Sequence, residues 1–248
     1  MNQWIKIFGS SSNYIEENLS LLKKNNNINK LLSFKLFIKI YSEKIIFRDF
    51  IHIMNFISGK LKLKKNQSLL DYGSGNGAIL NYFLKKFFLK NNISIELNNS
   101  FIKYQKQLLN NTKFIKANFF ETGYLKKIKN NSVDHVMCNS VFQYFISDQY
   151  AYEIIEEFIR ITKKRIIIYD LKNVKKKKEY QEVVRKRQGL TKFKFKEKYL
   201  KTPIRFYDKE FFLKKIKLNK LVKSVKICQL PNETLDNKFG FCVIIEKN

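Results

Sequence analysis

The stretch that most constrains the fold of this 248-residue chain is SLLDYGSGNGAILNYFL, residues 68–84. An apolar run ends in Asp71, three of the chain's eight glycines follow at alternate positions, and a segment with a helical apolar stripe comes next. Glycines let the backbone turn tightly and approach a ligand, and the first turn of a helix offers unpaired N–H groups. The stretch is therefore typical of a strand, a ligand-binding turn and a helix in an open α/β sheet.

The rest of the chain after residue 68 alternates strand-like runs with helical stretches. The predicted strands are SLLDY, ISIEL, KFIKANF, SVDHVMCN and RIIIYD, followed later by LVKSVKICQL and KFGFCVIIEK with a hairpin-like link between them. Helices are predicted over residues 77–90, over 148–161 with Asp148 as the N-cap, and over 207–220. This alternation predicts a doubly wound, mostly parallel sheet covered by helices.

Two further segments stand apart from this pattern. Residues 1–66 are rich in Lys and Asn, and helical apolar spacing over 31–57 predicts an N-terminal helical extension or cover. The ligand-binding domain is then expected over residues 67–248. Within it, residues 171–201 carry 13 basic and 3 acidic residues, a net charge of +10. We interpret residues 172–206 as a basic insertion or lid, with a solvated helix and loop as the alternative.

The net charge of +28 has two interpretations. Clustered cations favour a polyanionic partner such as nucleic acid. However, the chain has 43 Lys, 6 Arg and 3 Ala, a composition also expected from a genome rich in A and T. The three scattered cysteines are expected to be buried thiols and not a disulfide framework or a zinc site. With two histidines in the chain, a histidine-rich metal site is not expected either. No secretory signal or membrane span is expected, so a cytoplasmic protein is predicted.

The spacing of the glycines separates three classes of ligand. A phosphate loop of the Walker type needs GxxxxGK[ST], and no Lys-Ser or Lys-Thr follows these glycines. The dinucleotide turn has the spacing GxGxxG, which Gly73-x-Gly75-x-Gly77 does not match. Here the chain resembles the class I S-adenosylmethionine (SAM)-dependent methyltransferases, whose first motif is Asp/Glu-x-Gly-x-Gly-x-Gly. The resemblance runs over about residues 69–170 and implies a seven-stranded sheet with an antiparallel last strand.

The resemblance also implies a set of residues that bind SAM. Glu96, at the end of ISIEL and 19 residues past Gly77, corresponds to the acid that accepts both ribose hydroxyls. Asn118 and Phe119 stand where the family commonly has an Asp and an apolar residue for the adenine. The implied cofactor-binding residues are Asp71, Gly73, Ser74, Gly75, Gly77, Glu96, Leu97, Asn118, Phe119, Asn139 and Tyr14.

Tyr14 is included among these residues because of a separate sequence resemblance at the start of the chain. QWIKIFGSSSNYIEEN is similar to a W-x3-F-G…Y-x2-R-N opening of methyltransferases found beside surface-sugar biosynthesis genes. Glu17 replaces the Arg that would meet the methionine carboxylate, and two extra residues separate Gly9 from Tyr14. Ordinary helix packing is the alternative role for Tyr14.

Methyl transfer from a sulfonium is an in-line displacement, so the protein mainly has to position the acceptor and exclude water. An oxygen acceptor also needs a base or a hydrogen-bond acceptor near its proton. Candidates for this role are Tyr144 after the fourth strand, Asp170 at the end of the fifth, and His52 on the N-terminal helix. His135 lies inside a strand and is expected to point away from the site.

The acceptor class is narrowed mainly by motifs that the chain lacks. Its only prolines, Pro203 and Pro231, do not form the Asn/Asp-Pro-Pro-aromatic motif of base-amine methyltransferases, and its cysteines lack the context of a cytosine-carbon nucleophile. The leading hypothesis is methyl transfer to an O or N of a small polar metabolite, such as a sugar or nucleotide-sugar of a surface polysaccharide, phosphorylated or nucleotide-linked. An RNA-modifying methyltransferase and a non-catalytic SAM-fold binding protein are the alternatives.

Overall fold

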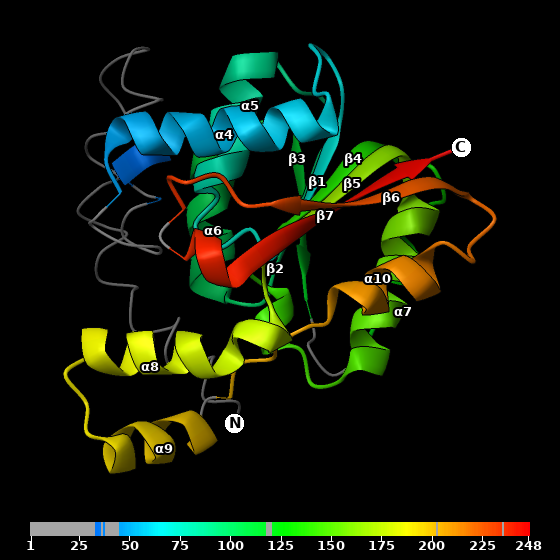
Figure 1. Cartoon of the computed structure of the whole chain (residues 1–248). Helices are drawn as coiled ribbons and strands as arrows, with labels where there is room; N and C mark the ends of the chain where they lie inside the picture. The colour runs from blue at the N-terminus through cyan, green and yellow to red at the C-terminus, as the bar shows by residue number, and fades with distance from the viewer. Residues whose placement is uncertain (1–32, 36, 38–44, 118–120, 202, 235) are drawn as a thin grey trace.

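Seven strands form one sheet in the computed structural model, which describes residues 33–35, 37, 45–117, 121–201, 203–234 and 236–248. Their order across the sheet is β3-β2-β1-β4-β5-β7-β6 (Figure 1). The strands are β1 (Leu69–Tyr72), β2 (Asn92–Glu96), β3 (Thr112–Lys116), β4 (Val133–Asn139), β5 (Thr162–Lys172), β6 (Val222–Gln229) and β7 (Gly240–Lys247). Each follows from an apolar run that the sequence marks as a strand.

All the strands point the same way except the last. β1 pairs in parallel with β2 and β4, whereas β7 pairs in antiparallel fashion with both β5 and β6. The predicted seven-stranded sheet with an antiparallel last strand is therefore confirmed. β1 lies near the middle of the sheet. The chain adds β2 and β3 on one side of β1 and then β4 to β7 on the other side, so the direction of winding reverses beside β1. The carboxyl ends of β1, β2, β4 and β5 consequently meet along one edge, which is where such sheets bind ligands.

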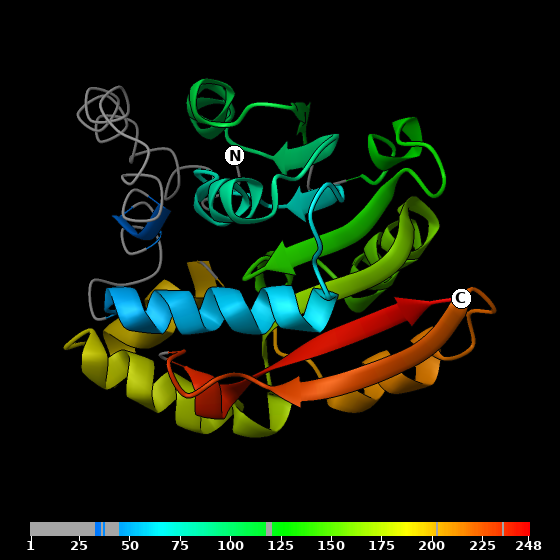
Figure 2. The same cartoon turned by 90° about the horizontal axis from the view of Figure 1, so that it is seen from above.

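Helices cover both faces of the sheet, and each face has its own apolar core. One face carries α7 (Asp148–Ile161) and α10 (Lys209–Ile216), and the other carries α4 (Phe47–Leu61), α5 (Ala78–Phe87) and α6 (Asn99–Leu108) (Figure 1). The alternation of side chains along a strand divides the two cores, since Val136 and Cys138 of β4 belong to the first and Met137 to the second. Figure 2 shows α4 lying over the sheet, where it contacts β5.

The start of α7 differs from the prediction by one residue. Ser147, not Asp148, is the N-cap, and its hydroxyl accepts a hydrogen bond from the Tyr150 N–H at 3.0 Å. Asp148 lies in the first helical turn, where a carboxylate is still favourable beside the helix dipole, and pairs with Arg205 at 2.8 Å. Both residue types cap helices well, so the choice depends on the backbone, which is extended at Ser147.

The N-terminal extension is described only at its end. Phe50, Met54 and Ile57 of α4 are fully buried against the sheet, so this helix contributes to the core of the α/β fold. The helical prediction over residues 31–57 falls partly outside the described residues, and the boundary at residue 66 stays a prediction.

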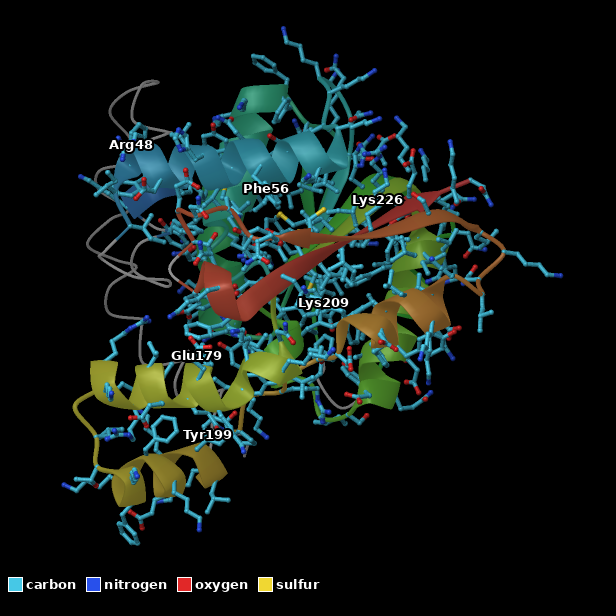
Figure 3. All side chains as sticks on the ribbon, in the orientation of Figure 1. Arg48, Phe56, Glu179, Tyr199, Lys209 and Lys226 are labelled. Carbon is cyan, nitrogen blue, oxygen red and sulfur yellow. The ribbon has the colours of Figure 1, made fainter. Side chains whose placement is uncertain are left out.

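Between β5 and α10 the chain leaves the sheet and forms α8 (Lys177–Arg187) and α9 (Lys192–Lys201), which stand away from the sheet (Figure 1). Tyr199 lies between the two helices (Figure 3), and α9 has no buried residue. The pair falls within the predicted basic insertion, and Phe193 and Leu200 of α9 are exposed. In the described part of the chain, no helix is both long and apolar enough to cross a membrane.

The C-terminal strands bring two of the cysteines together. Cys228 of β6 and Cys242 of β7 are direct partners in the antiparallel register, although 13 residues separate them in the sequence. Both are free thiols, as is Cys138, and Cys138 and Cys242 are buried.

Candidate active site

A cavity opens at the carboxyl edge of the sheet, between the ends of β1, β2, β4 and β5. One end contains the glycine-rich turn after β1, and the other contains side chains that follow β4 and β5. Of the predicted site residues, it is lined by Asp71, Gly73, Ser74, Gly75, Glu96, Leu97, Asn139, Tyr144 and Asp170.

Gly73 begins the turn and requires glycine for two reasons. Its φ of +70° lies in the left-handed region, and a Cβ there would stand 2.3 Å from Cγ2 of Val141. Its N–H donates to the Ile95 carbonyl at 2.8 Å, which ties the turn to β2. The close approach of Val141, just after β4, explains why the chain cannot carry a side chain here.

Gly77 supports the turn but does not line the cavity. It is the N-cap of α5 with a φ of +80°, and a Cβ would stand 3.0 Å from Cγ of Gln105 on α6. Gln105 is fully buried and donates from Nε2 to the Ser74 hydroxyl at 2.8 Å and to the Gly75 carbonyl at 2.5 Å. The hydroxyl of Ser94 donates to its Oε1. Gln105 therefore stabilises the turn from α6, on the side away from the cavity.

Glu96 joins the end of β2 to the glycine turn. Its Oε2 accepts from the Gly75 N–H at 2.7 Å, and its Oε1 accepts from the N–H groups of Leu97 at 2.8 Å and Asn98 at 2.9 Å. Burial raises the pKa of Glu96, and these three amides oppose that shift. The result is a carboxylate in fixed orientation on the cavity wall, with lone pairs left for hydroxyl donors.

Asp71 lies below the turn, at 3% exposure. Burial, and then the negative charge of Glu96, raise the pKa of Asp71 to about 8. A buried carboxylate with a like charge beside it is costly to ionise. A cation in the cavity would reverse that balance, so this end of the cavity has the electrostatics of a site for a positively charged ligand.

The other end of the cavity is centred on Asp170. The β4–β5 and β5–β7 registers place Asp170 near the end of β5, where the β5–β7 register shifts between Ile168 and Leu171. Asp170 has a φ of +64° and Ser140 a φ of +56°. This left-handed region is tolerated by aspartate but strained for serine. The Ser140 hydroxyl donates to Oδ2 of Asp170 at 2.7 Å. The bulge and the strained backbone turn the carboxylate into the cavity.

Lys172 lies two residues further on and is 3% exposed. Its Nζ is 2.8 Å from Oδ1 of Asp170 and 3.5 Å from Oδ2 of Asp236, and it stands 5.3 Å from the centre of the Tyr180 ring. Burial opposes its charge, but Asp170, Tyr180 and Asp236 together outweigh burial and raise the pKa of Lys172 above its ordinary value. The lysine is therefore a charged, internally paired part of the wall.

Tyr144 and Gln143 belong to the turn of 3-10 helix after β4, η3 (Phe142–Tyr144). Burial raises the pKa of Tyr144, with a hydrogen bond from Gln143 as a smaller opposing effect. The phenol is thus neutral near pH 7 and acts as a hydrogen-bonding group. Gln143 is buried, and its Oε1 has no hydrogen-bond partner among the described residues.

The structure does not bring every candidate residue to this cavity. His52 of α4 is half-exposed, and its Nδ1 lies 2.8 Å from Oε1 of Glu233, outside the cavity lining. His135 points away, as expected from its place in a strand, with Nε2 3.1 Å from Oε1 of Gln67. Tyr14, Asn118 and Phe119 lie outside the described residues.

Several lining or supporting residues carry no signal in the sequence analysis. Lys172 follows Asp170 at a spacing of two in a strand, the one hint that both reach the same edge. The others depend on tertiary contacts. These missed residues are Gln105, Gln143, Lys172, Tyr180 and Asp236.

The fold is that of the class I SAM-dependent methyltransferases, a Rossmann-like sheet, and the cavity adds the glycine turn and an acid after the second strand. Residues 70–169 match the family described as Methyltransferase domain. The chain thus carries a methyltransferase domain and is an enzyme of that class, with SAM as its cofactor. No curated protein matches it in sequence.

Solved structures share the fold at low sequence identity. Geranyl diphosphate C-methyltransferase from Streptomyces coelicolor A3(2), solved with Mg²⁺, geranyl-S-thiolodiphosphate and S-adenosyl-L-homocysteine, has a TM-score of 0.55 and 13% identity, covering 79% of this chain and 75% of that one. A putative methyltransferase of Haloferax volcanii, in complex with the Trm112 activator, has a TM-score of 0.54 and 11% identity over 81% and 93%. The cyclopropane synthase MmaA2 of Mycobacterium tuberculosis has a TM-score of 0.53 and 14% identity over 75% and 66%.

Proposed function

We propose that the protein transfers the methyl group of SAM to an oxygen or nitrogen of a small polar metabolite. The observation that carries the proposal is that one cavity joins the glycine turn and Glu96 to the polar group formed by Ser140, Tyr144 and Asp170. A cofactor end and an acceptor end in one cavity are what group transfer needs, since both reactants must be held in line and away from water.

The residues of the cofactor end fit SAM. Glu96 has a fixed carboxylate for the ribose hydroxyls, and Asp71 has a carboxyl that a cationic ligand would stabilise in its ionised form. The backbone of Gly73 to Gly75 approaches the ligand, while Leu97 and Asn139 complete the wall. SAM supplies a methyl group on a positively charged sulfur, which makes that methyl carbon reactive toward a lone pair.

The residues of the acceptor end serve to orient a nucleophile and take its proton. The lone pair of the acceptor O or N forms the bond to the methyl carbon, the carbon–sulfur bond breaks with its electron pair kept by sulfur, and the acceptor loses its proton. The Asp170 carboxylate lines the cavity and retains lone pairs beyond those used by Ser140 and Lys172. We assign it the role of accepting the proton. Tyr144, neutral at pH 7, orients the acceptor.

The finer substrate hypotheses extend this proposal. A sugar of a surface polysaccharide fits the polar acceptor end, because hydroxyls pair well with carboxylate and amide oxygens. A phosphorylated or nucleotide-linked acceptor draws support from the basic helix α8, whose Tyr180 lines the cavity. RNA is the second candidate, favoured by the exposed lysines of α8 and α9. A cytoplasmic location belongs to the same proposal.

Titration calorimetry with SAM is the primary test. Wild-type protein should bind SAM, and Glu96→Ala should weaken binding roughly 30- to 150-fold, because a charge-assisted hydrogen bond contributes about 2–3 kcal/mol. Glu233→Ala is the matched control, since Glu233 pairs with His52 outside the cavity. Wild-type protein that fails to bind SAM, or equal losses in both variants, would contradict the proposal and exclude a role for this carboxylate in cofactor binding.

A further inference from the structure

The charge of the cavity is opposite to that of the protein. The chain has a net charge of +28, yet among the described residues the cavity lining has one cation, Lys172, and four carboxyls. The carboxyls are Asp71, Glu96, Asp170 and Asp236. In a chain with this excess of lysine, an acidic lining is not what composition alone would produce. Among the described residues, the lining therefore favours neutral or cationic ligands over anions.

The single lining cation is already paired. Lys172 is held between Asp170 at 2.8 Å and Asp236 at 3.5 Å, with 4% of its side chain exposed. The other oxygen of Asp236 lies 3.3 Å from the Arg187 guanidinium, which is outside the lining. To bind a phosphate, Lys172 would have to leave a carboxylate buried without its partner, at a cost comparable to the pairing gained. The lining of described residues therefore lacks a cation available to an incoming anion.

The acceptor end instead has unused hydrogen-bond acceptors. Oε1 of Gln143 is buried without a partner among the described residues, although the residue is held in place by the bond from the Arg205 N–H to its carbonyl at 2.8 Å. A buried polar atom left unsatisfied costs about 1–3 kcal/mol. The Asp170 carboxylate adds further acceptor capacity. A ligand that donates hydrogen bonds would satisfy the Asp170 carboxylate, and would reach Oε1 of Gln143 after that side chain turns toward the cavity that the residue lines. A phosphate dianion would face both groups with its own acceptors.

The basic residues lie outside this space. Lys176 and Lys238 pair with the exposed Glu179 of α8, and α9 has no buried residue; Figure 3 shows Glu179 and Tyr199 on this outlying pair of helices. Their charge raises the local concentration of anions at the surface, but it is exposed to solvent and screened by salt. None of these basic residues is part of the described cavity lining.

Resting on the proposed function, we propose that the acceptor is a hydroxyl or amine compound that enters the cavity as an uncharged or cationic hydrogen-bond donor, with no phosphate in the acceptor end. Gln143 is its specificity-determining residue: its side chain turns toward the cavity, and the amide oxygen then receives a hydrogen bond from the acceptor molecule beside Asp170. The phosphorylated metabolite then becomes the less favoured hypothesis, and any phosphate of a larger substrate remains outside the cavity.

The test uses the full-length protein, methyl-labelled SAM and a low-molecular-weight bacterial metabolite extract separated by ion exchange into anionic, neutral and cationic fractions. We expect label in the neutral or cationic fraction. Parallel reactions contain the anionic fraction with and without Mg²⁺, the same fraction after phosphatase treatment, and total RNA. The inference is overturned if label is found only in the untreated anionic fraction or in RNA. It is also overturned if the neutral, cationic and phosphatase-treated fractions all lack label.

A variant pair tests the role of Gln143. Gln143→Leu should lower kcat/KM for the labelled fraction at least tenfold, mainly through KM, while its SAM affinity stays within twofold of wild type. Gln149→Leu is the matched control, since Gln149 is exposed on α7 and bonds to Glu153. Equal kcat/KM in wild type and Gln143→Leu would remove Gln143 from acceptor recognition. Wild-type protein that does not bind SAM would instead contradict the proposed function. Failure of the inference about Gln143 and failure of the proposed function are therefore distinguishable.

Discussion

The cofactor end of the cavity is made largely of backbone, whereas the acceptor end is made of charged side chains. At the cofactor end, Gly73 and Gly75 expose main chain, and Glu96 fixes it by accepting from the Gly75 N–H. At the acceptor end, Asp170, Lys172 and Asp236 form an internally paired cluster drawn from distant parts of the chain. A backbone site is sensitive to shape and conformation, and a side-chain cluster is sensitive to charge. Substitutions at the two ends of the cavity should therefore have independent effects on stability, SAM affinity and methyl transfer.

The largest effect is expected at Gly73. Gly73→Ala places a methyl group 2.3 Å from Val141 at a φ of +70°, and we expect a loss of about 2–5 kcal/mol in the free energy of unfolding, from overpacking and left-handed strain. Denaturant unfolding measures it. Gly59→Ala in α4, where a Cβ meets nothing within 4 Å, should instead gain up to about 1 kcal/mol. Adding Val141→Ala should restore part of the loss, and no restoration would mean that the clash is not its source.

The next effect separates the two ends directly. Asp170→Asn keeps a side chain that tolerates a left-handed backbone but removes the nearer of the two carboxylates that pair with Lys172, leaving Asp236 at 3.5 Å. We expect unfolding free energy to fall by about 1–3 kcal/mol, methyl transfer to fall sharply, and SAM affinity to stay within twofold. Adding Lys172→Gln should recover part of the stability but no activity. A SAM affinity that falls together with activity would show that the ends are not independent.

The third effect is a pH dependence of the cofactor end. Because the pKa of Asp71 is raised to about 8, the carboxyl is protonated in the free protein near pH 7 and must ionise to meet a cationic ligand. SAM affinity should rise roughly tenfold per pH unit between about pH 5.5 and 7, with proton release on binding. Calorimetry in buffers of different ionisation enthalpy measures that proton, and Asp71→Asn should abolish its release.

The same raised pKa affects stability with the opposite sign. Between the ordinary carboxyl pKa and about 8, the folded protein without ligand holds more protons than the unfolded chain, so its stability falls as pH rises through this range. Saturating SAM should flatten that slope, and an unchanged slope would show that the ligand does not meet Asp71.

The smallest effect is expected outside both ends. His52→Ala removes a half-exposed pair with Glu233, and such pairs contribute at most about 1 kcal/mol. Activity, SAM affinity and acceptor preference should all stay within twofold of wild type. A loss of activity of tenfold or more would restore His52 as a catalytic candidate and would extend the acceptor end to α4.

Sequence patterns identify the cofactor end better than the acceptor end, for a physical reason. Asp71, the glycines and Glu96 lie at the ends of successive strands, so local periodicity and spacing place them at one edge. Lys172 meets Asp236 only because β7 runs antiparallel and carries its preceding turn back to the carboxyl end of β5. Gln105 is one polar residue in a mostly polar helix, and its burial follows from the position of α6. The N-cap of α7 is Ser147 and not the predicted Asp148, because the backbone is extended at Ser147.

The antiparallel β7 has a consequence for how such an enzyme changes over evolutionary time. Residues of the cofactor end precede Ser140, whereas the acceptor end is completed by Asp236, near the end of the chain. Recombination in the part of the gene after the codon for Asn139 would therefore exchange the acceptor-binding wall and leave most of the SAM-binding wall intact. The fold is partitioned so that a new substrate is acquired without rebuilding the donor site.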